Sequence, residues 1–187
     1  MSNLLRIDTL NKLKKPAIIG ISGFGGSGKS TFARQLAKEI HADIIGLDSF
    51  CTSNSSVDFE LWNIMDFNRL KNEVLEPYVA GNKTITFGEF DWVKNEVSGS
   101  STIAAKDYLI IEGVGLLRPE LLKYFSFTIW IDCPIEVAIS RGKQRDRNEY
   151  GVIQDDKWDG VWKENDLQCY KEYSPLETAD FVLPYER

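Results

Sequence analysis

The segment Gly23–Ser30 carries the most specific chemical pattern in this chain. Its sequence, GFGGSGKS, matches G-x-x-x-x-G-K-[ST] at every fixed position. Glycines let the backbone turn tightly, so that successive N–H groups point at one anion, and a helix that begins near Lys29 adds its positive end. The pattern therefore predicts a loop that holds a nucleoside triphosphate together with Mg²⁺.

Individual residues of this loop have distinct expected roles. Lys29 is expected to reach the β- and γ-phosphates, and Ser30 to place its hydroxyl on Mg²⁺. Contacts to the nucleotide are expected from the whole loop: Gly23, Gly25, Gly26, Ser27, Gly28, Lys29, Ser30 and Thr31. A glycine turn without a ligand is the alternative, but a buried strand before the loop and an amphipathic helix after it favour the phosphate site.

The rest of the chain narrows the class of enzyme. A GTPase needs a base-reading N-K-x-D, and the sequence has none. Residues 43–46 fit D-x-x-G, but they open a predicted strand and come too soon after the loop to meet a γ-phosphate. The chain is also short for motor and transporter ATPases. A small-molecule kinase remains, in which a hydroxyl attacks the γ-phosphate of ATP.

Such a kinase needs a carboxylate that accepts the hydroxyl proton, and an acidic residue that helps to bind the metal. Asp48 follows the apolar run 44–47, and Glu112 follows the apolar run 108–111. Ligands of open parallel sheets lie off the carboxyl ends of the strands, so both acids are expected to face the phosphate loop. The alternatives are a helix N-cap for Asp48 and solvation of a turn by Glu112.

Cations must also cover the transferring group. Arg141 and Arg145 lie four residues apart on a predicted helix, hence on one face, and Arg147 follows them. If this segment closes over ATP, Arg141 and Arg145 would neutralise the negative charge of the phosphates, and the closed segment would exclude water. A solvated helix face paired with Asp146 and Glu149 is the alternative.

Short apolar runs alternate with helical stretches, which predicts an α/β fold with a parallel sheet. Buried strands are expected at 17–21, 44–47, 108–111, 127–131 and 181–183, and a strand-like run at 84–87. Helices are expected at 29–40, 68–80, after Pro134, and along an aromatic stripe at 158–173. Residues 53–56 and 97–101 are expected to be loops.

Bulk composition fits one domain of 187 residues with 43% hydrophobic residues. The net charge of −6 argues against nucleic-acid and membrane-surface partners. With no signal peptide or membrane-spanning run, a cytoplasmic protein is expected; a homo-oligomer stays open. His41 stands at the end of the first long helix, so a surface or capping role is expected, and the three cysteines lack metal-ligand spacing.

Taken in order, these segments resemble the uridine kinase and phosphoribulokinase-like branch of the P-loop kinases, from Ile18 to about Pro184. The segments that carry the resemblance are GGSGKST (25–31), LDSFC (47–51), DFNRLKNEVLEPYVAG (66–81), FGEFDW (87–92), LIIEGVGLL (109–117), RGKQRDRNEYG (141–151) and SPLETADFVLP (174–184). The loop alone occurs in many ATPases, whereas the ordered set is much more specific.

The resemblance implies a single P-loop kinase domain over 1–187, a five-stranded parallel sheet with helices on both faces, an acceptor-side hairpin at 84–104 and an arginine lid at 141–156. It makes Asp48 the general base and Glu112 the acid that orients metal-bound water. It also implies that Phe90, Asp91 and Trp92 form part of the wall around a small-molecule acceptor.

The departures from the family pattern fall on the acceptor side. Cys51 and Phe90 stand where tyrosines are common, and no histidine follows Trp92. ELWNIMDF (60–67) replaces the usual D-x-P-x-A-x-D stretch, which leaves Asp58, Asn63 and Asp66 as candidates for a ribose-binding residue.

The resemblance implies that the acceptor is a nucleoside of the uridine or cytidine type, or a similar small metabolite, and the altered nucleoside-reading residues extend the expectation to substrates that lack the uracil contacts. A vitamin precursor or a pentose phosphate is an alternative. A non-catalytic nucleotide-binding regulator is another, although such a protein would need neither Asp48 nor Glu112.

Overall fold

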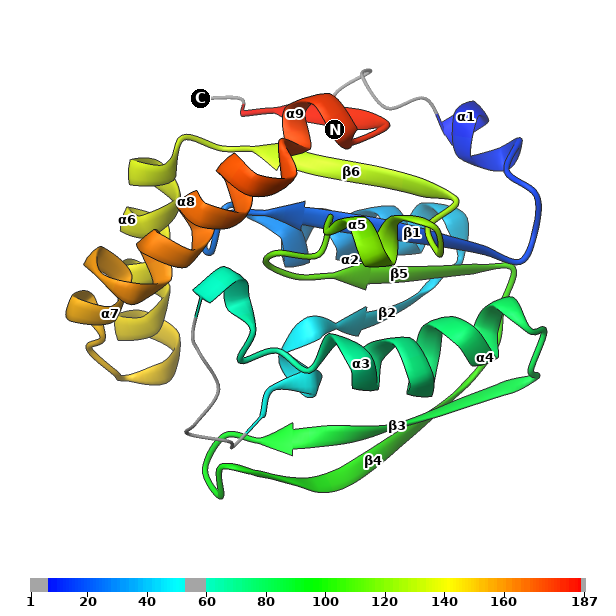
Figure 1. Cartoon of the computed structure of the whole chain (residues 1–187), viewed down its shortest axis with the longest axis horizontal. Helices are drawn as coiled ribbons and strands as arrows, with labels where there is room; N and C mark the ends of the chain where they lie inside the picture. The colour runs from blue at the N-terminus through cyan, green and yellow to red at the C-terminus, as the bar shows by residue number, and fades with distance from the viewer. Residues whose placement is uncertain (1–6, 53–59, 186–187) are drawn as a thin grey trace.

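The computed structural model describes residues 7–52 and 60–185. Its centre is a parallel sheet of five strands in the order β2-β5-β1-β6-β7 (Figure 1). The strands are β1 (Ala17–Gly23), β2 (Asp43–Gly46), β5 (Tyr108–Glu112), β6 (Phe127–Asp132) and β7 (Phe181–Pro184). The predicted five-stranded parallel sheet is confirmed. The expected loop at 53–56 and the candidate Asp58 lie outside the described residues.

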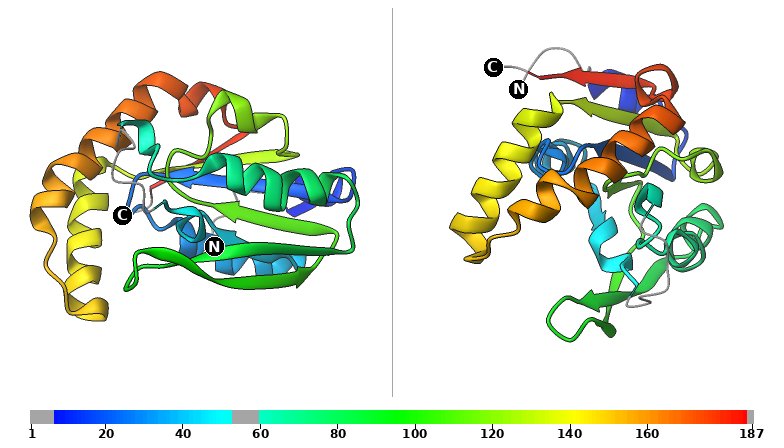
Figure 2. Two further views of the ribbon diagram at one scale, coloured as in Figure 1. Left: turned by 60° about the horizontal axis from the view of Figure 1, so that its bottom comes forward. Right: turned by 60° about the vertical axis from the view of Figure 1, so that its left-hand side comes forward.

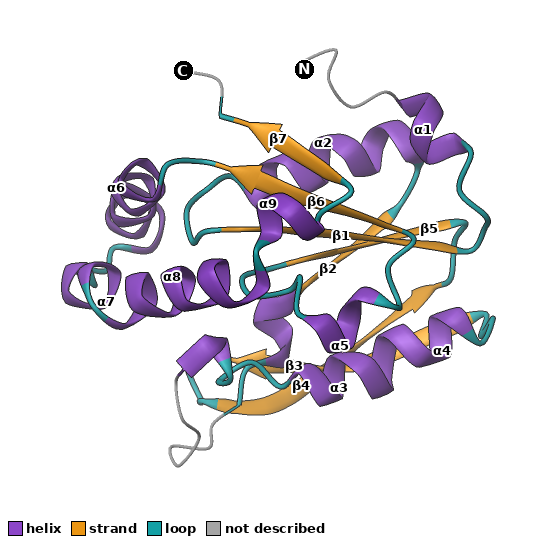
Figure 3. Cartoon of the chain, turned by 45° about the horizontal axis from the view of Figure 1, so that its top comes forward, coloured by secondary structure: helices purple, strands orange, loops and turns teal. Residues whose placement is uncertain are grey.

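Helices cover both faces of this sheet (Figures 2 and 3). On one face, α2 (Lys29–Ile40) buries Ala33, Leu36 and Ile40 in a core that includes Ile19 and Ile21 of β1, together with α1 (Ile7–Asn11). The other face is covered by elements that surround a second core: α3 (Phe67–Leu70), α4 (Glu76–Val79), α5 (Pro119–Leu122) and α8 (Val161–Tyr173). The short helix α9 (Pro175–Thr178) follows α8. Burial on both sides explains why the central strands read as continuous apolar runs.

Two predicted helices lie within one residue of the expected limits. The first runs from Lys29 to Ile40 and ends at His41, which is exposed and adopts a left-handed φ of 56°. The second covers 67–79, with a π-helical turn at Lys71–Leu75 between α3 and α4. Tyr78 completes its buried face, whereas Val79, which was expected there, is 57% exposed.

The expected loop at 97–101 is wrong, because these residues belong to β4 (Glu96–Ala104). This strand pairs antiparallel with β3 (Thr84–Asp91), so the hairpin turns at 92–95 instead. Strand β4 is largely exposed and rich in serine, so it lacks the apolar alternation that identifies a strand in a sequence. Strand β3 supplies the buried face of the hairpin through Ile85, Phe87 and Phe90.

The arginine-bearing segment folds as α6 (Ile135–Arg145), a π-helical turn at Asp146–Tyr150, and α7 (Asp155–Asp159). These helices and α8 gather at one end of the sheet, at the left of Figure 1. A Cβ placed on Gly142 would come within 2.3 Å of the Trp158 ring, so only glycine permits this close packing of α6 on α7.

Cys51, Cys133 and Cys169 are free and buried. Burial raises the pKa of Cys51 to about 11 and that of Cys169 to about 12, and it also raises the pKa of Cys133. Within 7–52 and 60–185, no helix combines the length and the apolar character needed to cross a bilayer.

Candidate active site

Three neighbouring strands deliver the predicted catalytic residues to one edge of the sheet. The phosphate loop follows β1, Asp48 lies in a 3-10 turn (Leu47–Phe50) directly after β2, and Glu112 ends β5. In the sheet register, Glu112 lies opposite both Ile21 of β1 and Gly46 of β2. The structure therefore places both acids beside the loop, as the strand-end argument expected.

The backbone of the loop is shaped to bind an anion. Helix α2 begins at Lys29 with Gly28 as N-cap, and neither a capping side chain nor an acid in the first turn competes for its N–H groups. Gly26 has a φ of 79°, and an added Cβ there would lie 2.1 Å from the Ala138 carbonyl oxygen. The Ser27 hydroxyl is buried with no hydrogen-bond partner among the described residues, which fits a loop that receives phosphate oxygens.

Lys29 lies inside the loop that it is expected to serve. Its Nζ donates a hydrogen bond to the Phe24 carbonyl oxygen at 2.9 Å, and its side chain is buried. Burial lowers the pKa of Lys29, while the charges of Glu112, Asp166 and Asp48 act in the opposite direction. The ammonium thus lies in a mainly acidic environment, in the electrostatic field of the predicted base and the predicted metal-side acid.

Ser30 and Glu112 are in direct contact. The Ser30 hydroxyl donates to Glu112 Oε1 at 3.0 Å. Burial raises the pKa of Glu112, whereas Lys29 and the Ser30 hydrogen bond lower it. A hydroxyl beside a carboxylate is a hard oxygen donor pair that suits Mg²⁺. The described residues contain no cluster of three acidic, histidine or cysteine ligands. Magnesium ions in nucleotide sites commonly complete their coordination with phosphate oxygens and water.

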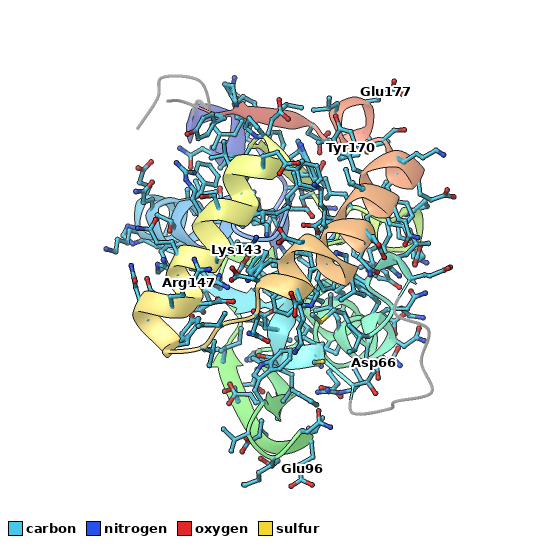
Figure 4. All side chains as sticks on the ribbon, turned by 90° about the vertical axis from the view of Figure 1, so that its left-hand side faces the viewer. Asp66, Glu96, Lys143, Arg147, Tyr170 and Glu177 are labelled. Carbon is cyan, nitrogen blue, oxygen red and sulfur yellow. The ribbon has the colours of Figure 1, made fainter. Side chains whose placement is uncertain are left out.

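The arginines of α6 lie differently from one another. Arg145 pairs with Asp146 Oδ1 at 2.9 Å, and its charge contributes to lowering the pKa of Lys29, which places it near the loop. Arg141 lies over the Tyr185 ring and influences the Cys133 thiol just beyond β6. Arg147 pairs with Asp155 at the outer end of the segment (Figure 4).

The hairpin residues predicted for the acceptor wall are held by contacts with one another. Phe90 is buried and packs edge-to-face on Trp92, with 5.0 Å between ring centroids, while Trp92 is 60% exposed. Asp91 accepts hydrogen bonds from the backbone N–H groups of Lys94 and Val93 and from the Ser98 hydroxyl, and these bonds lower its pKa. The carboxylate of Asp91 therefore organises the turn of the hairpin.

Two candidates for the ribose-binding residue, Asn63 and Asp66, line an open cavity of about 460 Å³. Its wall also includes Thr52, which follows Asp48 by four residues, and Arg118. Asp66 caps α3, since its Oδ1 accepts the Arg69 N–H at 2.9 Å. Figure 4 shows Asp66 on the opposite side of this end of the molecule from Lys143 and Arg147.

The sequence analysis missed Asp166 of α8. Its side chain is buried, and its Oδ2 accepts the Gly25 backbone N–H at 2.7 Å. Burial raises the pKa of Asp166 to about 6, although Lys29, Gly25 and Trp62 all favour its ionised form. A signal was available, because an acid interrupts the apolar stripe between Trp162 and Tyr170 at the spacing of the buried positions.

The raised pKa of Asp166 predicts a pH-dependent cost of folding. Well below pH 4 the carboxyl is protonated in the folded and unfolded chains, so the cost is absent. The cost grows between about pH 4 and pH 6, where the unfolded chain has ionised and the buried group still holds its proton, and it is constant at higher pH. Asp166→Asn removes this cost, which amounts to about 3 kcal/mol. The free energy of unfolding of the variant, relative to the original protein, should therefore rise between pH 4.5 and pH 7.5 in urea titrations.

Asp156→Asn is the matched control, because Asp156 is exposed on α7. A difference between the Asp166→Asn variant and the original protein that stays constant over this pH range would contradict the raised pKa.

Comparisons with known proteins point to one family. The sequence profile of the phosphoribulokinase/uridine kinase family matches residues 18–164. A uridine kinase from Clostridium perfringens is 29% identical over 152 residues, which cover 74% of this chain and 72% of the relative. A uridine kinase from Cronobacter sakazakii is 30% identical over 162 residues, covering 78% of this chain and 75% of the relative.

Solved structures share the fold. One from Bacillus stearothermophilus, described as a possible uridine kinase, has a TM-score of 0.69 and 22% identity, and 94% of each chain is covered. Another from Silicibacter sp. TM1040, provisionally described as a fructose transport system kinase, has a TM-score of 0.70 and 21% identity, covering 94% of this chain and 95% of the other. At these identities the likeness shows the fold alone.

Proposed function

The chain belongs to the phosphoribulokinase/uridine kinase family of P-loop kinases, and from this premise we propose that it transfers the γ-phosphate of ATP to a hydroxyl group of a nucleoside or a similar small metabolite. The phosphate loop, Asp48 and Glu112 lie together at the ends of three adjacent strands, and this arrangement is the main support for the proposal. A loop that only captured nucleotide would need neither acid.

Each residue then has a separate task. Lys29 leaves the Phe24 carbonyl and stabilises the charge on the β- and γ-phosphates. Asp48 holds the acceptor hydroxyl and takes its proton during the attack. Arg145, near Lys29, and Arg141 cover the phosphates as α6 closes over the loop. The segment 84–104 forms the acceptor side, with Phe90, Asp91 and Trp92 in its wall.

Ser30 and Glu112 would hold Mg²⁺, Glu112 through a water molecule. Such an ion would neutralise negative charge on the phosphates of ATP. The direct contact between the hydroxyl and the carboxylate supports this assignment, because it brings a possible ligand of the ion next to an acid that could hold the ion's water.

A nucleoside is the favoured acceptor because the similar curated proteins named above are uridine kinases. Purified protein with ATP and Mg²⁺, offered one alcohol at a time, should release ADP with uridine or cytidine and far more slowly with pentose phosphates or pantothenate-like alcohols. The same panel is run with the Glu112→Gln variant, and the difference in ADP release from the original protein measures how much of the release depends on Glu112.

Three outcomes of this panel are distinct. Release with nucleosides supports the proposal. Release confined to a pentose phosphate or a vitamin precursor would move the protein to another acceptor class. ATP binding without release for any alcohol would identify a nucleotide-binding regulator and overturn the kinase proposal.

A further inference from the structure

Helix α8 carries a buried carboxylate that joins two segments far apart in the chain. Asp166 Oδ2 accepts the Gly25 N–H of the phosphate loop at 2.7 Å, and its Oδ1 accepts the Trp62 indole N–H at 2.9 Å. Only 6% of the Asp166 residue surface is exposed. In Figure 1, α8 crosses the sheet next to the end of β1 that leads into this loop. Placing an acid here is costly for folding, so its two specific partners call for a functional explanation.

The segment Glu60–Trp62, which receives this contact, adopts an unusual backbone conformation. Leu61 and Trp62 have φ angles of 52° and 58°, a left-handed region that side chains with a Cβ disfavour. Asn165 of α8 accepts the Trp62 backbone N–H at 2.7 Å, and Arg118 donates to the Leu61 carbonyl oxygen at 2.6 Å. This strained segment is therefore held by α8 and Arg118, rather than by its own local preferences.

From Trp62, backbone hydrogen bonds lead to the residues that follow Asp48. The Met65 N–H donates to the Trp62 carbonyl oxygen at 2.9 Å. The Thr52 N–H donates to the Ile64 carbonyl oxygen at 2.9 Å, and the Asp66 N–H donates to the Phe50 carbonyl oxygen at 2.6 Å. A continuous set of contacts thus runs from Gly25, through Asp166 and the 60–66 segment, to the turn that carries Asp48.

We propose that Asp166 is a positioning residue that couples occupation of the phosphate loop to the 60–66 segment and, through it, to the placement of Asp48. The inference rests on the proposed function, since the ligand on the loop is taken to be ATP. Asp166 lies in the electrostatic field of Lys29. A bound triphosphate draws Lys29 toward the phosphates and adds negative charge near Asp166, which changes how firmly the carboxylate holds its two donors. Coupling is reciprocal, so an acceptor that orders 60–66 tightens nucleotide binding by the same factor.

Hydrogen–deuterium exchange with Mg·AMPPNP as the probe tests this coupling. In the original protein, the nucleotide should slow exchange in the phosphate loop and change exchange at 61–66 by about fivefold or more. In Asp166→Asn, whose amide cannot accept both bonds, the loop should still be protected while the change at 61–66 disappears. Trp62→Phe removes the indole N–H together with part of the buried ring but keeps the Asp166 carboxylate and its Gly25 bond. It should give the same result, which keeps the test valid if Asp166→Asn folds poorly.

Asn165→Ala is the matched control, because Asn165 holds the same Trp62 but does not touch the loop. Exchange at 61–66 should be faster in this variant with and without nucleotide, while the ratio between the two states is kept. A purely structural role for Asp166 would give this control pattern in all three variants, and that result would overturn the proposal. The proposal would also be overturned if, in the original protein, AMPPNP slowed exchange in the phosphate loop but left exchange at 61–66 unchanged. If AMPPNP protects nothing in the original protein, the proposed function itself is wrong.

Discussion

Replacing Lys29 with alanine is expected to abolish nearly all phosphoryl transfer, with turnover lower by about 10³-fold or more. Lys29 is the buried cation of the loop, with Glu112, Asp166 and Asp48 around it. No other described cation lies within the loop itself, so the charge that develops on the transferring group would lose its fixed partner. Initial rates of ADP release with the best acceptor of the panel, at saturating ATP, give the measurement.

Lys38→Ala provides the control for this variant. Lys38 lies on the same helix, α2, but is exposed near its far end. Its replacement should leave turnover unchanged. Circular dichroism of both variants separates lost catalysis from lost folding. Retention of more than a tenth of the turnover by a folded Lys29→Ala protein would remove Lys29 from the proposed mechanism.

Asp48→Asn is expected to keep nucleotide binding but to lower transfer by about 10²-fold or more. The amide can still occupy the turn after β2, but it cannot take the proton of the acceptor hydroxyl. Titration with AMPPNP should therefore give a dissociation constant close to that of the original protein, while single-turnover transfer slows. The loss should appear in kcat rather than in the KM for ATP.

Asp43→Asn is the paired control, since Asp43 lies at the opposite end of β2 and forms an ion pair with Lys106. It removes an equal charge from the far end of the strand that leads to the Asp48 turn. Equal transfer rates in Asp48→Asn and in the original protein would refute the assignment of the general base.

Residues governed by local patterns could be predicted from the sequence. The phosphate loop, helix 29–40 and the five strands of the parallel sheet follow from glycine spacing and from apolar runs, which in the central strands reflect burial on both faces. Asp48 and Glu112 were predicted beside the loop because strand ends in a parallel sheet share one edge.

Features that depend on distant or solvent-exposed contacts could not be predicted in the same way. Strand β4 pairs through its backbone, and its serines and glycine resemble a loop sequence. Asp166 and Gly25 are 141 residues apart in the sequence, so no local spacing of residues predicts their contact. The left-handed backbone at Leu61 and Trp62 is imposed by α8 and Arg118, and nothing within the segment itself indicates it.

The sheltered thiols have a practical consequence for spectroscopy. Because Cys51, Cys133 and Cys169 are buried and hold their protons at neutral pH, maleimide and nitroxide reagents should react with them slowly. A pair of introduced cysteines at the highly exposed Val93 and Ile153 can therefore be tagged in the otherwise natural chain. Such labels lie at the tip of the β3–β4 hairpin and in the turn before α7. The distance between them can then be measured as nucleotide and acceptor are added.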